Sequence, residues 1–462
     1  MNPDHAPVPP SAVKEAMRSA LRNRMQDLAT WDRDAHQRIN RVRIPIEDIA
    51  ALHWLSVQTD TPRTYWANRN REFRMAGVGC THLLTGDGPI DLPDLQAKMA
   101  SRLNSYHPHL RYYGGLQFDL DAPVSSEWSS FGAYRFIIPE FEVYRKPGHT
   151  YFACNFRYLP DAPQALEALF DRLADIQFDL VLPDWEEHAP LLRRDHPEKT
   201  QWLANVEAVL KAMENGSFEK IVLARRAALE FTSNLNPLSY LLRLRMMSED
   251  TFNFFFQPDA DHAFVGASPE RLFRREGRQL VTEAIAGTRP RGRTKKEDQA
   301  LRKELLQSDK ELREHDFVVN MIREELEPLS IELNVDKEVS TTRLSHVQHL
   351  CKRFSARLAD EVSDADLLQR LHPTPAVGGY PREEALAMLR KIEPFPRGWY
   401  SGPVGFIGHD LAEFVVAIRS GLIERQRISL YSGAGIVRGS LPEAEWNEIE
   451  DKIGKFLKAL EF

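Results

Sequence analysis

The sequence has few cysteines, no long apolar run and no excess of positive charge, and each absence excludes a class of protein. Its three cysteines, Cys80, Cys154 and Cys351, are far apart and odd in number. They match neither a zinc-binding spacing nor a disulfide framework. No apolar run approaches the roughly 18–20 residues of a membrane span, and the N-terminus has no apolar signal core. These features predict a cytoplasmic protein with no membrane partner.

The charge balance bears on the kind of ligand. A net charge of −7 gives no support to nucleic-acid binding, so an anionic small molecule would have to be met by local cations. With 462 residues, of which 42% are hydrophobic and 27% charged, the chain has the composition of a globular protein. Its length suits two or three ordinary domains, or one large domain with a substantial core.

The order of predicted elements indicates the fold class. Strand-like runs separated by helices at irregular spacing predict an α+β fold with large, mainly antiparallel sheets flanked by helices. We expect one strand over 134–143 and a helix over 308–326, capped by Ser308. The proline-rich and charged loop 182–200 is the best boundary between an N-terminal half, residues 1–190, and a C-terminal half, residues 191–462.

Near the C-terminus, a β-like run is followed by glycines and then by a helical pattern. We expect a tight turn at Gly433 and Gly435, and a helix with Ser440 as its cap and Pro442 in its first turn. The glycines resemble a dinucleotide-binding fingerprint only superficially, because Arg438 stands where that pattern needs glycine. Glycine does allow backbone N–H groups to approach an anion.

Two predicted helices each carry a pair of glutamates at i, i+3. Glu311 and Glu314 share one face of the first helix, and Glu445 and Glu448 share one face of the last. If the two faces converge, their oxygens suit a hard cation such as Mg²⁺. Glutamates at this spacing are, however, more often a solvated helix face, and the spacing leaves both interpretations open.

Three further segments carry candidate groups. Lys220 begins an apolar strand, where desolvation can lower its pKa and make it a general base, although it can equally be an ordinary lysine at a strand edge. Glu270 follows another apolar strand and is either a general acid or a partner of Arg271. The glycine-bounded basic segment 287–292 is expected to form a turn.

Seven segments of the sequence resemble one family, the chorismate-utilising enzymes. They are FEKIVLAR (218–225), GASPERL (266–272), EAIAGTRPRG (283–292), SDKELREHD (308–316), HPTPAVGG (372–379), WYSGPVG (399–405) and YSGAGIV (431–437). They occur in the family's order and cover roughly residues 200–462, whereas the N-terminal half matches more loosely through TYWANR and GGLQFD. The resemblance implies a fold like that of anthranilate synthase component I, with both halves in one compact domain.

Within this family the nucleophile divides the members. Those that add ammonia generally carry glutamine at the position of Lys220, and those that add water carry lysine, so the chain resembles the isochorismate synthases. The resemblance implies that Lys220 activates a water to attack ring carbon C2 of chorismate, while Glu270 protonates the departing C4 hydroxyl. The lysine must then be neutral and the glutamic acid protonated.

The resemblance also implies a metal and a substrate site. Glu314 and Glu448 would ligate Mg²⁺, and Glu311 and Glu445 would hold its waters. The ion would neutralise the ring carboxylate of chorismate. Lys452 matches a position near that carboxylate and the metal, but it also stands four residues after Glu448 and can pair with it.

The second carboxylate of chorismate, on the enolpyruvyl group, requires further cations and donors. Positions that bind it in the family match Arg419 and Tyr400, helped by N–H groups near Gly435. Other positions match the lining of the substrate pocket: Gly287, Thr288, His372 and Thr374.

The place in metabolism is less sharply indicated. The segment 372–379 resembles the isochorismate synthases more than the salicylate synthases, which also eliminate pyruvate. Isochorismate feeds menaquinone in some bacteria and catechol siderophores in others, and the extended N-terminal region favours menaquinone. No glutaminase subunit is expected, because water is the nucleophile, and we expect a monomer or a weak dimer.

Overall fold

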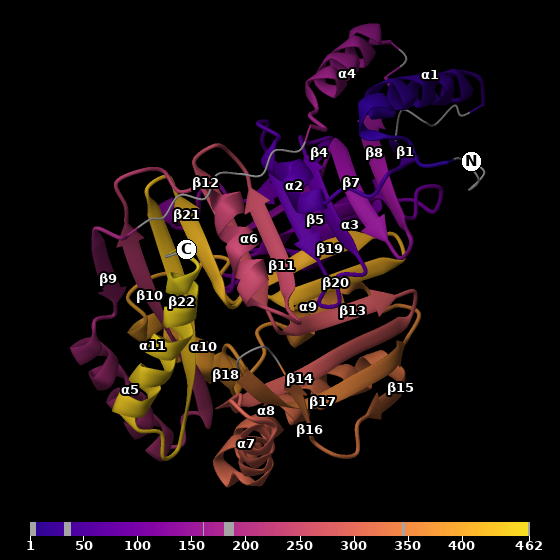
Figure 1. The fold of residues 1–462 in the computed structure, drawn as a ribbon. Helices are drawn as coiled ribbons and strands as arrows, with labels where there is room; N and C mark the ends of the chain where they lie inside the picture. The colour runs from indigo at the N-terminus through magenta and orange to yellow at the C-terminus, as the bar shows by residue number, and fades with distance from the viewer. Residues whose placement is uncertain (1–5, 32–37, 160, 180–188, 344–346, 461–462) are drawn as a thin grey trace.

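Two large antiparallel sheets form the centre of the protein (Figure 1). The computed structural model describes residues 6–31, 38–159, 161–179, 189–343 and 347–460. Within these ranges the first sheet has 12 strands and the second has 10. The predicted α+β class is therefore confirmed. No helix in the described part of the chain combines the length and apolar character needed to cross a membrane.

The strands of each sheet come from both halves of the sequence. In spatial order the first sheet contains β1 (Ile39–Ile46), β8 (His149–Arg157), β7 (Phe141–Lys146), β3 (Arg74–Val78), β2 (Arg63–Ala67), β11 (Phe252–Gln257), β12 (His262–Ser268), β21 (Ser420–Glu424), β22 (Arg427–Val437), β10 (Lys220–Glu230) and β18 (Gly379–Tyr380), with β9 (Leu192–His196) beside β10. The second contains β15 (Ser330–Val335), β17 (Val347–Leu358), β14 (Gln279–Pro290), β13 (Arg271–Glu276), β20 (Leu411–Val416), β19 (Pro403–Gly408), β5 (Arg111–Leu116), β6 (Tyr134–Ile138) and β4 (His82–Gly86), with β16 (Ser340–Arg343) beside β17.

The helices cover the outer faces and edges of the sheets. They are α1 (Val13–Trp31), α2 (Ala51–Ser56), α3 (Leu92–Ala100), α4 (Pro163–Asp175), α5 (Lys199–Glu214), α6 (Pro237–Met247), α7 (Lys295–Gln307), α8 (Asp309–Leu326), α9 (Asp364–Leu371), α10 (Arg382–Ile392) and α11 (Pro442–Lys458). Two of them matter most for the site: α8 packs on β14 and α11 packs on β22. The predicted cap of α8 is confirmed, because the Ser308 hydroxyl accepts a hydrogen bond from the Glu311 N–H.

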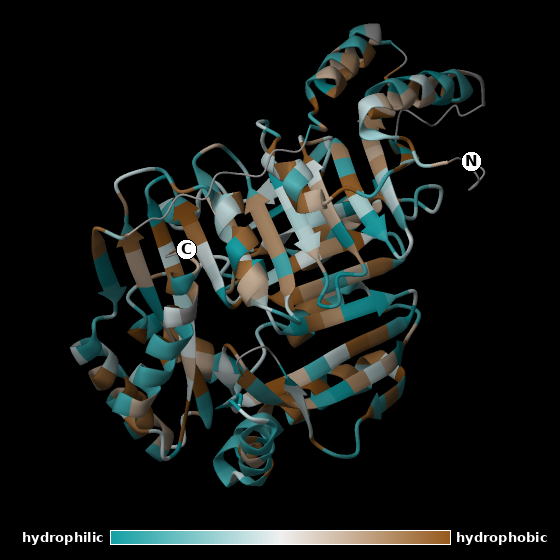
Figure 2. Cartoon of the chain, in the orientation of Figure 1, coloured by the Kyte–Doolittle hydropathy of each residue, from teal (hydrophilic) through white to brown (hydrophobic). Residues whose placement is uncertain are grey.

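The core lies between the two sheets and is rich in aromatic side chains. Every residue of β11 is buried, and Figure 2 shows apolar strands through the middle of the molecule. Trp66 of the first sheet meets Phe406 of the second edge-on, with ring centres 5.7 Å apart. Such edge-to-face pairs add to the free energy gained by burying apolar area. This packing holds the two sheets at a fixed spacing.

Two of the places where the chain passes from one sheet to the other carry candidate residues. The chain leaves the first sheet after β12 and enters the second at β13, with Glu270 between them. It returns between β20 and β21, with Arg419 between them. The two crossings are hydrogen-bonded to each other, since Val416 N–H donates to Glu270 O at 3.1 Å and Ala267 N–H donates to Arg419 O at 3.0 Å. The fold therefore places the carboxyl group of Glu270 near the guanidinium cation of Arg419.

The boundary predicted near residue 190 falls where both halves already share strands. β2 pairs with β11, and β5 pairs with β19. The predicted loop 182–200 is wrong over its second part, because β9 pairs with β10 there; residues 182–188 lie outside the described residues. The division into 1–190 and 191–462 stays a prediction.

Other local predictions need correction. The strand expected over 134–143 is two strands in different sheets, β6 and β7, because Pro139 has no N–H to continue a ladder and lies between them. The basic segment at 287–292 is mostly strand: β14 runs to Pro290 with a bulge at Gly287, where φ is +69°.

The glycine turn at Gly433 and Gly435 is also wrong. β22 runs through both glycines and pairs with β10 in unbroken register, because glycine permits a turn without requiring one. The turn comes at Gly439, where φ is +89°. Ser440 does not cap the last helix, since its hydroxyl accepts from Val437 N–H at 3.2 Å and Leu441 occupies the cap position. Pro442 does lie in the first turn, as predicted.

Candidate active site

Lys220 lies inside the first sheet and not at its edge. It opens β10 and pairs on one side with Val437 and on the other with Tyr380. Its side chain is fully buried, and Nζ lies 3.0 Å from Oε1 of Glu314 on α8. A lysine enclosed in this way is available only to groups inside the site.

Gly435 makes room for this lysine–glutamate pair. It lies opposite Val222 in the β10–β22 ladder. A Cβ atom at Gly435 would stand 2.6 Å from Glu314 Oε1 and 3.4 Å from Lys220 Cε. Any larger residue would push the two charged groups out of place. The expected binding of a carboxylate by N–H groups near Gly435 stays a prediction, but it no longer rests on a turn.

Glu270 is buried and its environment favours the protonated form. Burial, together with the charge of Glu283, raises the pKa of Glu270 to about 7, against the opposing effects of Lys220, Thr374 and Arg419. The Thr374 hydroxyl donates to Glu270 Oε1 at 3.5 Å. Arg271 already has an ion-pair partner, Glu413, at 3.2 Å. It therefore does not require Glu270 as a partner. At neutral pH, Glu270 can give up a proton.

Arg419 is fixed by a histidine that the sequence did not single out. Its Nη2 lies 3.3 Å from His349 Nε2. His349 Nδ1 lies 3.1 Å from Gly287 O and 3.1 Å from Thr288 Oγ1. Because a carbonyl only accepts, Nδ1 carries the proton and Nε2 accepts from Arg419. Gly287, Thr288 and Arg419 are therefore joined in one network.

Tyr400 and His372 are each fixed by contacts of their own. The Tyr400 ring stacks on Tyr431 with centres 5.1 Å apart, and its hydroxyl approaches Gly433 closely enough to lie 3.2 Å from a Cβ built there. His372 donates from Nε2 to Phe118 O at 2.8 Å. Burial lowers the pKa of His372 to about 4, so the ring is neutral and Nδ1 is an acceptor.

The four candidate glutamates, two on α8 and two on α11, each face a cation. Glu314 is held by Lys220, as described above. The remaining ion pairs are Glu311–Arg289 at 2.7 Å, Glu445–Lys310 at 3.3 Å and Glu448–Lys452 at 2.6 Å. Lys452 also donates to Gly433 O at 2.9 Å. The side chains of Glu311, Glu314 and Glu445 are mostly buried, whereas that of Glu448 is 44% exposed. The solvated face that the spacing left open therefore describes Glu448 alone.

These glutamates suit Mg²⁺ by their chemistry. Carboxylate oxygens are its usual protein ligands. In the described part of the chain, no three acidic, histidine or cysteine side chains already form a metal-binding group. A cation is nevertheless accommodated: although partial burial alone would lower the pKa of Lys310, the charges of Glu445, Glu311 and Glu314 raise it. The residues fit a divalent ion that takes the place of such side-chain cations.

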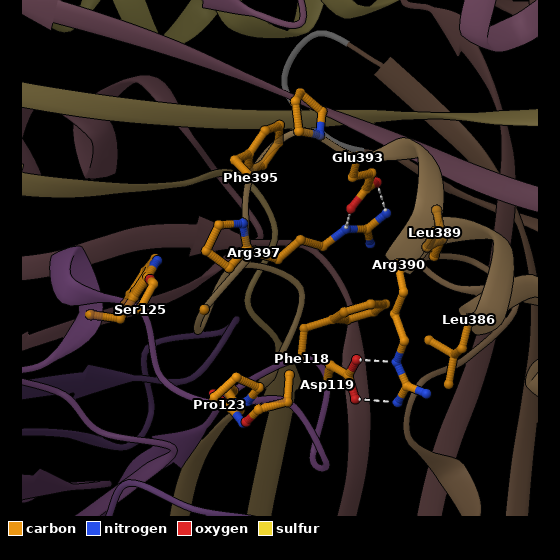
Figure 3. A pocket seen from close by; sticks show the side chains of 16 residues that line it. Phe118, Asp119, Pro123, Ser125, Leu386, Leu389, Arg390, Glu393, Phe395 and Arg397 are labelled. Atoms are coloured by element: carbon orange, nitrogen blue, oxygen red, sulfur yellow. Dashed lines mark hydrogen bonds and ion pairs between the residues drawn. The ribbon is translucent and has the colours of Figure 1, made fainter.

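A cavity of about 350 Å³ lies apart from these residues (Figure 3). Two pairs of oppositely charged residues cross it: Asp119 with Arg390, and Glu393 with Arg397. Arg397 also donates to Val222 O at 2.6 Å, on the strand that carries Lys220. The candidate residues do not line the cavity, whose wall includes Phe118, the acceptor for His372.

The candidate groups include a protonatable acid, a buried amine and nearby cations, which acid–base chemistry on an anionic small molecule would require. Direct contacts join Lys220 to Glu314, Glu270 to Thr374, and Glu448 to Lys452. Gly287 connects the His349 network to the glutamates of α8, because a Cβ atom at Gly287 would lie 2.9 Å from Glu311 Oε2. Sequence reasoning missed His349, Lys310 and Arg289. Lys310 and Arg289 stand inside recognisable motifs, but His349 has no local signal.

Comparison with known proteins identifies the family of the chain. The family described as "Chorismate binding enzyme" matches residues 24–461. The chain is 32% identical to isochorismate synthase 2, chloroplastic, from Arabidopsis thaliana, covering 98% of this chain and 85% of that protein. It is 34% identical to the salicylate biosynthesis isochorismate synthase of Pseudomonas aeruginosa, covering 87% and 85% respectively. The structure of MenF, the menaquinone-specific isochorismate synthase from Escherichia coli, matches with a TM-score of 0.85 and 30% identity, covering 96% of this chain and 100% of that one.

The fold and the relatives therefore define the class of this protein, an α+β enzyme. More particularly, the chain belongs to the chorismate-binding enzyme family. The family resemblance inferred from the sequence motifs is confirmed, and it extends through the N-terminal half.

Proposed function

We propose that this enzyme is an isochorismate synthase that converts chorismate into isochorismate. The relatives named above carry this activity in their names and match nearly the full length of the chain. The observation that carries the proposal is the enclosure of Lys220 and Glu270 in one buried site, close enough for the charge of Lys220 to lower the pKa of Glu270.

In this reaction Lys220 accepts a proton from water as the water oxygen bonds to ring carbon C2. The ring double bonds shift, and the C4–oxygen bond breaks as Glu270 donates its proton to the departing hydroxyl. One water enters and one leaves, so the net reaction is an isomerisation. Glu270 suits the acid role because its pKa of about 7 leaves a large protonated fraction at neutral pH. Lys220 Nζ lies 3.0 Å from Glu314 Oε1, so this contact has to be released before Lys220 can accept a proton from water.

Binding of the dianionic substrate is assigned to the remaining groups. Arg419, oriented by His349, and Tyr400 would hold the enolpyruvyl carboxylate, while His372 and the Thr288 hydroxyl would line the pocket. We propose that Mg²⁺ is held by Glu314 and Glu448, with Glu311 and Glu445 holding its waters. When bound, Mg²⁺ would supply positive charge for the ring carboxylate and take over the neutralisation of Glu314 from Lys220.

Product analysis tests the proposed activity. Purified enzyme incubated with chorismate and Mg²⁺, followed by chromatography, is expected to yield isochorismate at a rate that ammonium does not increase. A chelator should abolish turnover, and added Mg²⁺ should restore it. Anthranilate, aminodeoxychorismate or salicylate as the main product would refute the assignment.

We further propose that the isochorismate feeds menaquinone synthesis in the cytoplasm. The support is the match to the menaquinone-specific enzyme along 96% of this chain, which includes the N-terminal region. Because one relative is named for salicylate biosynthesis, a role of this enzyme in siderophore synthesis is the second candidate. Loss of menaquinone on deletion of the gene would favour the first role, and loss of a catechol or salicylate siderophore the second.

A further inference from the structure

The peptide groups on both sides of Glu270 are held by one partly buried ion pair. Arg69, in the turn that follows β2, donates to both carboxylate oxygens of Glu283 on β14. The same guanidinium donates to the carbonyl of Pro269, the residue before Glu270. Glu283 Oε1 in turn accepts from the N–H of Arg271, the residue after Glu270, at 3.4 Å. The Arg69–Glu283 pair therefore holds the backbone at residues 269 and 271 by hydrogen bonds.

The backbone of Glu270 itself is fixed as well. Its N–H donates to Ser268 Oγ at 3.2 Å and its carbonyl accepts from Val416 N–H at 3.1 Å. With these bonds made, the direction of the Glu270 side chain depends on the rotation of the peptide groups at 269 and 271. Those are the groups that Arg69 and Glu283 hold.

We propose that Arg69 and Glu283 are positioning residues that set both the place and the acidity of the Glu270 carboxyl group. This inference rests on the proposed function in so far as Glu270 is the acid of the reaction. Arg69 belongs to the N-terminal half and Glu283 to the C-terminal half. The pair is thus a reason why the catalytic half needs the N-terminal strands.

The electrostatic part follows from the groups that face Glu270. These are Glu283 from β14, Lys220 from β10, Arg419 from the β20–β21 crossing, and the Thr374 hydroxyl. Lys220, Thr374 and Arg419 favour the anion. Burial, followed by the charge of Glu283, opposes them and raises the pKa of Glu270 to about 7. Arg69 is the ion-pair partner of Glu283, which is only 7% exposed.

Two substitutions separate the charge effect from the position effect. Glu283→Gln removes the charge that opposes ionisation, so the pKa of Glu270 should fall by about one unit or more. The alkaline limb of the kcat/KM profile should move to lower pH by the same amount. Arg69→Lys keeps the positive charge but cannot bridge Glu283 and Pro269 O with a planar fork. It should lower kcat roughly tenfold or more while leaving the limb in place.

Controls make the result decisive. Asp364→Asn removes a carboxylate that is equally buried and bidentate with Arg275 at the far end of β13, and it should leave the limb unmoved. If Glu283→Gln does not fold, the double change Arg69→Met with Glu283→Met, which leaves no unpaired charge, must still shift the limb to lower pH. A limb that stays at its wild-type pH in the variants lacking Glu283 would overturn the proposal.

A titration of Glu270 that does not depend on turnover separates this inference from the proposed function. The carboxyl band of Glu270 in infrared difference spectra, wild type minus Glu270→Gln, reports its pKa directly. If that pKa falls in Glu283→Gln while the wild type makes no isochorismate, the positioning pair stands and the function fails. If isochorismate is made but the pKa does not move, the positioning pair fails alone.

Discussion

The site contains glutamates of two opposite kinds, and the difference lies in their surroundings. Glu270 is enclosed where the chain crosses between the sheets, and burial with the nearby charge of Glu283 raises its pKa to about 7. Glu448 stands on α11, where burial acts in the same direction but the charges of Lys452, Lys310 and Lys220 outweigh it and lower its pKa. Glu270 is therefore held toward the protonated form, as donation of a proton would require, and Glu448 toward the charged form, as binding of a cation would require. Burial and the neighbouring charges together make the difference: Glu270 is 5% exposed, whereas the Glu448 side chain is 44% exposed beside lysines.

The largest effect is expected from removing the acid. Glu270→Gln keeps the shape but cannot donate a proton to the C4 oxygen, so kcat should fall by about 10²–10⁴-fold, the usual worth of a general acid. The measurement is steady-state isochorismate formation at saturating chorismate and Mg²⁺. A variant with more than half of the wild-type kcat would mean that another group supplies the proton.

The same variant should be more stable than the wild type at high pH. A carboxyl group whose folded pKa is raised contributes stability that is complete below its unfolded pKa of 4.5 and is lost as the pH rises to about 7. The difference corresponds to about 3 kcal/mol, so Glu270→Gln should melt higher than the wild type above pH 7 and similarly to it below pH 4.5. This readout also excludes misfolding as the cause of lost turnover.

A smaller effect is expected on the helix side. Glu448→Gln should weaken Mg²⁺ binding on the order of 10- to 100-fold and weaken chorismate binding with it, because the ring carboxylate loses its counter-charge. Calorimetric titration with Mg²⁺, with and without chorismate, measures both. Glu443→Gln is the matched control, since it removes a carboxylate from the first turn of the same helix that pairs with Lys199. Equal losses in the two variants would contradict a specific role for Glu448.

Many residues of the candidate site could be predicted from the sequence, because the motifs that contain them are local. The cap at Ser308 and the i, i+3 glutamates follow from helical periodicity, and Lys220 and Glu270 each end or begin an apolar strand. What failed depended on pairing between distant segments. Gly433 and Gly435 are strand residues only because β10 lies beside them, and His349 enters the site only because β17 pairs with β14. Likewise, Arg69 reaches Glu283 across 214 positions of sequence, a contact that no local pattern contains.

The most direct test of this account is the protonation state of Glu270 in the resting enzyme. Infrared difference spectra between wild type and Glu270→Gln, recorded across the pH range, should show a protonated carboxyl band that disappears with a midpoint near pH 7. The same experiment on Glu448→Gln should show no protonated carboxyl at neutral pH, because the pKa of Glu448 is lowered. A Glu270 band that disappears near the ordinary glutamate pKa of about 4.3 would contradict the account, since the two glutamates would then be alike.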